Sequence, residues 1–421
     1  MTRDLDPKST RVLVGIPLVL AMLSMIGPFS IDTPFPAFSQ MERDFSVGAA
    51  DLQLIVTVYM LAFAVASLFH GPLSDAIGRR PVIVGSLAVY GAASVAMMWA
   101  PSLEWVLAGR VVQGISAGGA MIVSRTIIRD LFDGEDAQRL MSRVAVIFGV
   151  APAVAPIAGG LLLQVGDWPL IFGFLGVFAL VLVLATVAVL PESHPAGSRV
   201  PLRAGEVVRG LVEVVKEAEF HTMAWGGTLV FAAQFLYIGG AAIFLGDLLG
   251  QGELDYWKLF VPMIGAMMVG SSLSGRLAGR VAPARMVSIG FALALCGAVL
   301  AAALALTSWG VELPWAVVGI SVVALGNGLA YPNIQLLMLD LVPRRRGAVM
   351  SAGSFVTLVF NAVVAVAITP VVGTSVLGFA LTALVLVALG WACWRWHTAT
   401  AARRTASAAR VAVEAEAASA Q

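Results

Sequence analysis

The sequence predicts an all-α membrane protein with twelve transmembrane helices in two pseudo-symmetric six-helix bundles. Of its 421 residues, 59% are hydrophobic and only 12% are charged, whereas charged residues make up about a quarter of a soluble domain. Apolar runs long enough to cross a bilayer, about 20 residues each, recur along the whole chain. The basic residues between these runs fall almost entirely on one side, which is typical of proteins that cross a membrane many times.

Eleven apolar runs supply the twelve spans. The last run has no charged residue and is long enough for two helices, with a turn expected at Gly373-Thr374-Ser375. Helices are the expected structure because every backbone polar group needs a partner inside lipid. The runs are 12–31, 52–74, 81–103, 105–128, 144–166, 168–191, 220–246, 257–279, 286–311, 313–339 and 347–394.

The distribution of Lys and Arg predicts the orientation of the chain. With an even number of spans both termini lie on one side, and 23 of the 26 basic residues fall there, including Arg125 at the end of the run 105–128. Arg43 and Lys258 fall on the other side, and Arg110 lies inside a span. Basic loops stay in the cytoplasm, so we expect a multi-pass protein of a bacterial-type inner (plasma) membrane with both termini cytoplasmic.

The longest loop on that side divides the chain. We expect an N-terminal six-helix bundle at 1–191, a cytoplasmic linker at 192–219, a C-terminal bundle at 220–396 and a cytoplasmic tail at 397–421, frayed or disordered from Thr398 onward. Apolar residues recur at helical spacing among charged ones in the linker, which predicts a short amphipathic helix on the membrane surface. These apolar residues are Val207, Val208, Leu211, Val212 and Val215.

A faint internal repeat supports the division into two halves. Residues 73–79 follow the second span and residues 273–280 follow the eighth, and both segments end in Gly-Arg. The second copy lacks the acid found at Asp75 in the first. Parallel halves of this kind suit a transporter that rocks around a central site near the middle of the membrane.

Several classes of function are excluded by what the sequence lacks. The net charge of +1 gives no basic surface for nucleic acid. Cys296 and Cys393 lie in apolar runs and suggest neither a disulfide framework nor a metal cluster, and the four histidines are scattered at loop edges. No phosphate-binding loop with Lys and Ser or Thr occurs, which disfavours ATP hydrolysis. We therefore expect no enzyme activity, no metal and no cofactor.

The loop after the second span reads GPLSDAIGRR over residues 71–80 and resembles the signature loop of the major facilitator superfamily. A sharp turn there would set Asp75 against Arg79 and a neighbouring helix end, forming a charge cluster that holds one conformation and releases in the other. A plain cytoplasmic turn is the alternative. The candidate residues of this conformational latch are Gly71, Asp75, Gly78, Arg79 and Arg80.

The fourth span contains RVVQGISAGGA over residues 110–120, which is similar to the Arg-x-x-Gln-Gly block of the same superfamily. Arg110 is six residues beyond Glu104, about 9 Å below the outer edge, and an arginine at that depth indicates a function by default. A structural arginine paired with backbone carbonyls is the alternative. Gly114 and Gly118 predict close helix packing.

The fifth span contains GVAPAVAPIAGG over residues 149–160 and resembles the antiporter motif that marks exporters within the superfamily. Each proline removes a backbone donor and bends the helix, while glycines allow it to approach a neighbour. We expect this block to work as a gate and a kink rather than to carry chemistry. Its residues are Gly149, Pro152, Pro156, Gly159 and Gly160.

The end of the first span, with Asp32 in IDTPFPA, and residues 129–132, RDLF, resemble the bicyclomycin/chloramphenicol-resistance branch of the twelve-span drug:proton antiporters. The sequence departs from that branch because Thr33 is followed directly by Pro34 and the aromatic residue is Phe35. The resemblance implies export of small lipophilic drugs by alternating access, driven by the proton gradient alone. Asp32 would carry the coupling proton, with Arg110 at a similar depth modulating its proton affinity.

Two other functions stay open at this stage: proton-coupled uptake of a small metabolite, and a non-transporting membrane receptor or enzyme. The expected partners are a small-molecule drug, protons and the lipid bilayer, with the chain acting as a monomer. The substrate would bind between the halves near mid-membrane, where Met and aromatic side chains accommodate varied ligands. The candidates are Met25, Tyr59, Gln113, Met121, Gln234, Tyr237, Tyr331, Asn333 and Asn361.

Overall fold

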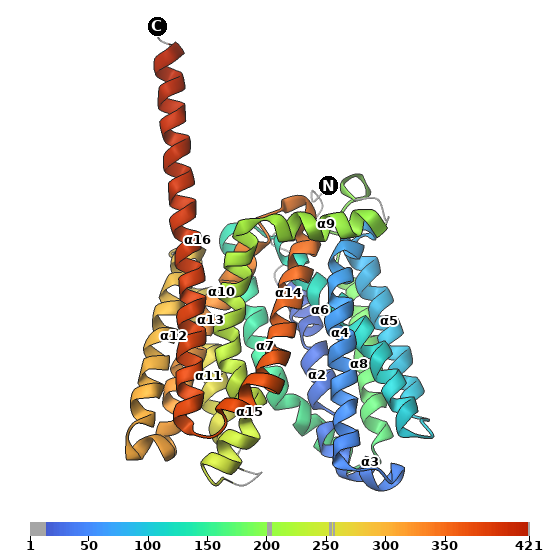
Figure 1. The fold of residues 1–421 in the computed structure, drawn as a ribbon. Helices are drawn as coiled ribbons and strands as arrows, with labels where there is room; N and C mark the ends of the chain where they lie inside the picture. Colours follow the sequence, from blue (N-terminus) through green and yellow to red (C-terminus); the bar gives the residue numbers. More distant parts are fainter. Residues whose placement is uncertain (1–13, 200–203, 252–254, 256, 420–421) are drawn as a thin grey trace.

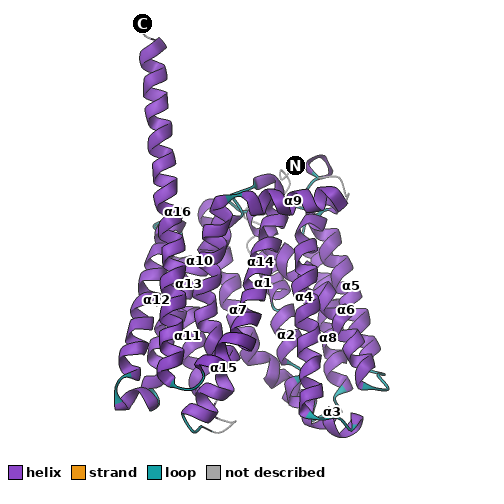
Figure 2. Ribbon diagram, in the orientation of Figure 1, coloured by secondary structure: helices purple, strands orange, loops and turns teal. Residues whose placement is uncertain are grey.

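The fold is known from a computed structural model that describes residues 14–199, 204–251, 255 and 257–419. Every regular element among these residues is a helix (Figure 2). Most of the helices run side by side along one axis and form two groups (Figure 1). Arg3, Lys8 and Arg11, and Arg203 in the linker, lie outside the described residues.

The first half contains the helices before residue 190. Its first span is broken near Met25 and Pro28 into two short helices, and a 3-10 turn at Phe35–Ala37 follows them. The helices are α1 (Ile16–Ser24), α2 (Ile26–Asp32), α3 (Phe38–Phe45), α4 (Ala49–Ile77), α5 (Arg79–Met97), α6 (Leu103–Leu131), α7 (Gly134–Leu162) and α8 (Pro169–Val189).

The second half begins at residue 218, after α9 (Ala204–Lys216) in the linker. A π-helical segment, Ala242–Leu248, extends α10, and another, Val364–Ile368, joins α14 to α15. The turn expected at residues 373–375 separates α15 from α16. The helices are α10 (Ala218–Gly239), α11 (Trp257–Arg276), α12 (Pro283–Ala305), α13 (Trp315–Met338), α14 (Arg346–Val363), α15 (Thr369–Val372) and α16 (Val376–Ser419).

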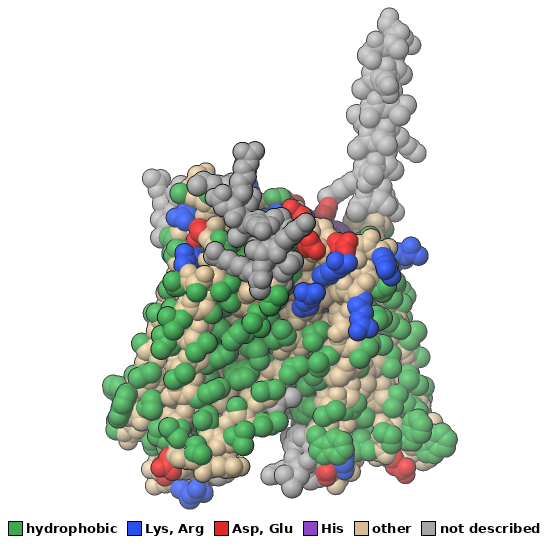
Figure 3. All heavy atoms as spheres, turned by 180° about the vertical axis from the view of Figure 1, so that it is seen from behind, with side chains coloured by type: hydrophobic (Ala, Val, Ile, Leu, Met, Phe, Trp, Pro, Cys, Tyr) green, Lys and Arg blue, Asp and Glu red, His purple; other side chains and the backbone are tan. Residues whose placement is uncertain are grey.

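The helices have the length and composition of membrane spans. Ten candidate spans lie in the described part of the chain, and α7 adds an eleventh that is bent by 43° between residues 151 and 154. The remaining long helix, α10, is more polar, with Glu219, His221 and Gln234 in its 22 residues. It takes the first place in the second half and completes the twelve-helix fold. Apolar side chains cover the middle of the molecule, and charged ones gather toward its two ends (Figure 3).

The pseudo-symmetry of the halves extends to a backbone detail. The repeated segments 73–79 and 273–280 follow α4 and α11, the second helices of the two halves. Each contains a glycine with positive φ, 106° at Gly78 and 79° at Gly279, a conformation that residues with a Cβ rarely adopt. The repeat found in the sequence therefore corresponds to the same chain reversal at the same place in each half.

The two halves touch at one end and separate at the other. We call the end where α4 ends and α14 begins the closed end, and the opposite end, near α3 and α15, the open end (Figure 1). At the closed end α14 packs on α4, and α7 packs on α11. At the open end a notch separates the halves in the space-filling view (Figure 3).

Two segments at the closed end need comment. The helix expected in the linker is α9, and it contacts both α4 and α14, so it bridges the halves. The tail was expected to be frayed or disordered from Thr398, and that prediction is wrong for the backbone, because α16 continues as one helix to Ser419 and projects beyond the bundle (Figure 1). The tail is rich in alanine, which has the highest intrinsic helix propensity.

Candidate functional site

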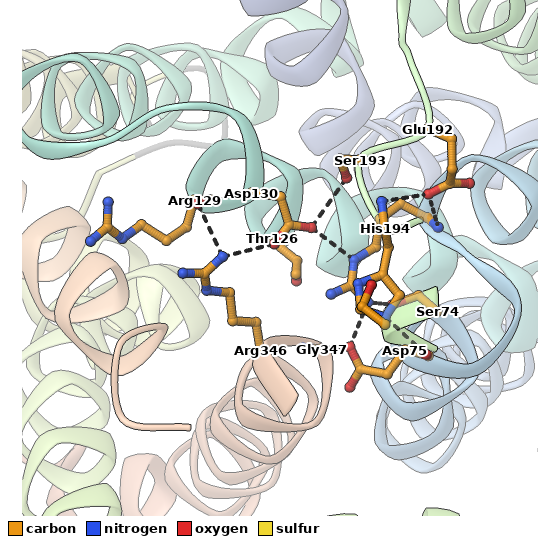
Figure 4. Close-up of polar contacts among 12 residues, drawn as sticks. Ser74, Asp75, Thr126, Arg129, Asp130, Glu192, Ser193, His194, Arg346 and Gly347 are labelled. Carbon is orange, nitrogen blue, oxygen red and sulfur yellow. Dashed lines mark hydrogen bonds and ion pairs between the residues drawn. The ribbon is translucent and has the colours of Figure 1, made fainter. Parts of the chain in front are cut away.

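Asp75, at the end of α4, reaches across to the other half at the closed end. Its carboxylate accepts hydrogen bonds from the backbone N–H groups of Gly347, at 3.3 Å, and Ala348, at 3.1 Å, in the first turn of α14. These N–H groups have no partner within the helix, and the positive end of the helix dipole favours an anion there. One carboxylate of the first half thus caps a helix of the second (Figure 4).

Gly71 allows this approach. A Cβ on Gly71 would lie 1.8 Å from the carbonyl oxygen of Gly347, so the two backbones are in direct contact at this point. The N–H of Gly71 also donates to the hydroxyl of Ser351 on α14, at 2.8 Å. Glycine at both positions lets α4 and α14 approach more closely than side chains would permit.

Arg79 connects Asp75 to the rest of the first half. Its guanidinium pairs with Asp75 at 2.5 Å and with Asp130, at the end of α6, at 3.0 Å, and it is only 1% exposed. Burying this charge is offset because two carboxylates face it. The neighbouring Arg80 donates to the carbonyl of Val187 on α8.

The beginning of the linker closes over this cluster. Glu192 accepts hydrogen bonds from the backbone N–H groups of Arg79 and Arg80, at 2.9 and 3.2 Å, and so caps α5. Ser193 donates to Asp130 at 3.1 Å. The Nε2 of His194 lies 3.1 Å from the carbonyl of Asp75, which can only accept, so this nitrogen carries the proton.

His194 is half-buried, and its pKa is held below the usual range of histidine. Burial is the larger cause, and the nearby positive charge of Arg79 acts in the same direction. The carboxylates of Asp75 and Asp130 oppose it. The ring is therefore neutral near pH 7, and a proton added to it would place a second cation beside Arg79.

Further contacts between the halves surround this cluster. Arg129 forks onto Asp340 at 2.7 and 3.1 Å, and Arg346 pairs with Asp130 at 3.1 Å. Deeper between the halves, two pairs of neutral side chains meet: Gln138 with Asn333 at 2.8 Å, and Ser142 with Ser274 at 3.0 Å.

The antiporter block lies where α7 bends. Gly149 faces α11, where a Cβ would lie 2.2 Å from Cε of Met267, and Gly160 faces open space. The bend at residues 151–154 falls at Pro152, and Pro156 begins the next turn, as expected for prolines inside a helix. Gly159 packs directly on the first span, because its Cβ would lie 2.2 Å from the carbonyl oxygen of Thr33.

Asp32 is the last residue of α2, in the half of the membrane that faces the open end. Among the described residues it has neither a hydrogen-bond nor an ion-pair partner in this conformation. The contact of Thr33 with Gly159 places Asp32 beside the antiporter block. A carboxylate with no partner inside a transmembrane span is uncommon and marks ion pathways.

Arg110 is fully buried on α6 but does not pair with Asp32 in this conformation. Its guanidinium donates to the carbonyl of Ile55 at 2.9 Å and to Gln113 at 2.8 Å, and it lies 4.4 Å from the ring centre of Tyr59. The alternative of an arginine held by a backbone carbonyl thus describes part of its environment. Tyr59 is close enough to feel the charges of both Arg110 and Asp32.

The proposed substrate residues separate into two groups. Three of them lie inside one half: Tyr59 beside Arg110, Gln113 bonded to Ser94 at 2.7 Å, and Tyr237 packed between Phe244 and Phe379. These three do not face the space between the halves, contrary to our expectation. The helices bearing them are apolar on all sides, so sequence alone cannot assign their inner faces.

The other candidates lie nearer the interface of the halves. Asn333 bonds across it to Gln138, and Gln234 accepts from Asn327 at 2.7 Å and lies against Met267. Tyr331 lies beside Arg125 of the other half. The remaining three are Met25 at the break of the first span, Met121 packed against Gly27, and Asn361, whose side-chain oxygen is buried without a partner.

Sequence reasoning missed several residues of the site. Asp130 served only as a branch marker, yet it binds both Arg79 and Arg346. Arg125 was counted among the loop residues, but it is buried inside α6 and 8% exposed. An acid following a long apolar span, close to a run of three arginines at 344–346, was the available signal for Asp130. The full set missed is Arg125, Asp130, Glu192, Asp340 and Arg346.

A sequence profile described as the Major Facilitator Superfamily matches residues 20–365. The chain belongs to this superfamily. A structure titled as the human organic anion transporter MFSD10 has the same fold, with a TM-score of 0.72 at 18% identity, covering 92% of this chain and 100% of that one. The protein is therefore a membrane transporter of small molecules and not an enzyme.

Curated relatives narrow the resemblance. An uncharacterized MFS-type transporter, YdgK of Bacillus subtilis (strain 168), is 28% identical over 86% of this chain and 89% of its own. A bicyclomycin resistance protein homolog of Haemophilus influenzae is 27% identical over 68% of this chain and 71% of its own. A chloramphenicol resistance protein of Pseudomonas aeruginosa is 28% identical over 68% of this chain and 67% of its own. The bicyclomycin/chloramphenicol-resistance branch indicated by the motifs is thus confirmed.

Proposed function

We propose that this protein is a proton-driven exporter of small lipophilic compounds that works by alternating access. The observation that carries the proposal is the packing of Gly159 on the carbonyl of Thr33. It joins the bend of α7 to the residue that follows Asp32. A change in the charge of Asp32 would then act directly on the helix that bends between the halves.

The proposed cycle starts from the conformation described above, with the closed end facing the cytoplasm. The excess of Lys and Arg on that side supports this orientation, although Arg125 is buried in a span and no longer counts toward it. The open end would then face outward, where Asp32 takes up a proton. The membrane would be a bacterial inner membrane and a single chain the transporting unit.

The contacts of Asp75 supply the proposed latch. Asp75, Arg79 and Asp130 belong to the first half, and their bonds to one another can persist as the halves rock. The bonds from Asp75 to α14, and from Asp130 to Arg346, cross between the halves and must break when the closed end opens. They would therefore stabilise the outward-facing conformation alone, which is the property a latch requires.

The names of the relatives support drugs as substrates. Two of them are named for resistance to bicyclomycin and to chloramphenicol. We propose that compounds of this size and polarity bind between the halves, near Tyr331, Gln234 and Asn361. Met25 and Met121 would supply adaptable apolar contacts.

The test uses the purified chain in proteoliposomes with an imposed pH gradient and radiolabelled chloramphenicol. An exchanger of drug for protons accumulates chloramphenicol in the more acidic compartment, whereas a symporter accumulates it in the more alkaline one. The result does not depend on how the protein is oriented in the vesicles. Accumulation on the acidic side, absent from protein-free liposomes, is expected; accumulation on the alkaline side would favour the uptake alternative, and none at all would contradict both.

A further inference from the structure

Arg125 occupies an unusual place in α6. It lies six residues before the end of the helix at Leu131, about 9 Å along the axis, and is 8% exposed. Its guanidinium lies within hydrogen-bonding reach of the Tyr331 hydroxyl, on α13 of the other half. The guanidinium carbon is 5.5 Å from the ring centre of Phe148 on α7, within the range of a cation–π contact. The side chain therefore lies at the interface between the halves.

The other buried arginines have partners that Arg125 lacks. Arg79 faces two carboxylates, and Arg110 donates to a backbone carbonyl and to the Gln113 side chain. Among the described residues, no carboxylate pairs with Arg125. A guanidinium has five N–H donors, and one hydroxyl satisfies few of them. A buried cation of this kind is costly and presents free donors to any acceptor that enters the interface.

Aromatic rings surround the same place. Tyr331 stacks on Phe231 with ring centres 5.3 Å apart, and Phe231 lies 6.5 Å from Phe235, both on α10. These three side chains and Phe148 are partly exposed rather than fully buried. The interface thus combines one unpaired guanidinium with several flat apolar surfaces.

We propose that Arg125 binds the head group of substrates that combine an aromatic body with a carboxylate or sulfonate. A planar guanidinium binds such oxyanions through two parallel hydrogen bonds, and the rings of Tyr331, Phe231 and Phe148 pack against the body. The same charge repels lipophilic cations. This inference rests on the proposed function in placing the substrate between the halves, and it adds the chemical class that the site prefers.

The test compares three probes with one ring system: 2-naphthalenesulfonate, 2-naphthalenemethanol and 2-naphthylmethylammonium. Their dissociation constants are measured by calorimetry on the full chain in nanodiscs, with empty nanodiscs subtracted. The wild-type protein should bind the sulfonate most tightly and the ammonium least. Arg125→Gln should weaken sulfonate binding about 10- to 100-fold, as expected for loss of a charged hydrogen-bonded contact, and leave the alcohol unchanged.

Two further variants make the result decisive. Arg125→Lys keeps the charge without the planar fork, so it should preserve the order of the three probes with weaker sulfonate binding. Arg43→Gln removes an exposed arginine near the open end and should change nothing. If Arg125→Gln does not fold, the order in the wild-type protein and the selective loss in Arg125→Lys decide the matter.

The proposal is overturned if the wild-type protein binds the three probes equally, or if Arg125→Gln binds the sulfonate as well as the wild type does. Because these are binding measurements, they do not depend on proton coupling. A sulfonate preference in a protein that fails to exchange chloramphenicol for protons would contradict the proposed function and leave this inference standing. Equal binding with intact exchange would do the reverse.

Discussion

The carboxylate of Asp75 accepts a hydrogen bond from the backbone N–H of Ala348, 273 residues further along the chain, at 3.1 Å. The same carboxylate pairs with Arg79 at 2.5 Å within its own half. When the halves separate at this end, Asp75 keeps Arg79 and loses Ala348. The difference between the two conformations at this position is therefore a helix cap and its dipole interaction rather than an ion pair.

Asp75→Asn should slow transport without preventing folding or drug binding. The amide keeps the shape but loses the charge that favours the N-terminus of α14 and pairs with Arg79. A loss of about 1–3 kcal/mol shifts a two-state equilibrium by about 5- to 150-fold. Closure can be followed as disulfide formation in a Ser142→Cys, Ser274→Cys background, since these hydroxyls are 3.0 Å apart.

The matched control for this variant is Asp136→Asn, at an exposed acid in the first turn of α7 at the same end. It should transport and cross-link as the wild type does. Wild-type transport rates and cross-linking in Asp75→Asn would show that the loop is only a turn.

Gly71→Ala should open the closed end by steric means alone. The added Cβ would lie 1.8 Å from the carbonyl oxygen of Gly347, and backbone cannot move aside as a flexible side chain can. Gly85→Ala on α5 is the matched control, because nothing lies within 4 Å of its Cβ position. We expect the first variant to lose the 142–274 cross-link and the second to keep it; a full cross-link in Gly71→Ala would contradict the packing described.

The sequence predicted what depends on local pattern and missed what depends on distant pairing. Span lengths, the loop around Asp75 and the bend at Pro152 follow from nearby residues and are present in the structure. The partners of Asp130 are 51 and 216 residues away, and no local rule connects them. Arg125 was misplaced because a charge at the edge of an apolar run resembles a loop residue until the neighbouring helices are in place.

The orientation of the chain is open to direct labelling. Ser198 and Ser308 are exposed at the closed and open ends respectively, and each can be changed to cysteine after Cys296 and Cys393 are replaced by serine. In intact cells a membrane-impermeant maleimide should label Ser308→Cys and leave Ser198→Cys unlabelled until the cells are lysed. The opposite pattern would place the termini outside and reverse every assignment of side made above.

His194 should make stability depend on pH in one direction. Its pKa is held below the usual range by burial and by Arg79, so the folded protein takes up the proton less readily than the unfolded chain. The resulting stability is present above the ordinary pKa of histidine, about 6.5, and is lost as pH falls through that value toward the lower folded-state pKa. Between about pH 7.5 and about pH 5.5 the melting temperature of the wild type should fall more than that of His194→Gln. His221→Gln, at an exposed histidine of α10, should follow the wild type, and parallel curves for all three would exclude this role for His194.

Asp32→Asn should abolish transport driven by a pH gradient while leaving drug binding intact. The amide has nearly the shape of the carboxylate but cannot take up a proton, and Asp32 has no partner among the described residues whose loss would unfold the first span. In a weakly buffered solution, chloramphenicol added to the wild-type protein should release protons, because exchange requires drug and proton to compete. The variant should bind chloramphenicol with an affinity independent of pH and release none. Glu312→Gln, at an exposed acid near the open end, is the control and should behave as the wild type. Asp32→Asn protein that still accumulates chloramphenicol in the acidic compartment would show that another group carries the proton.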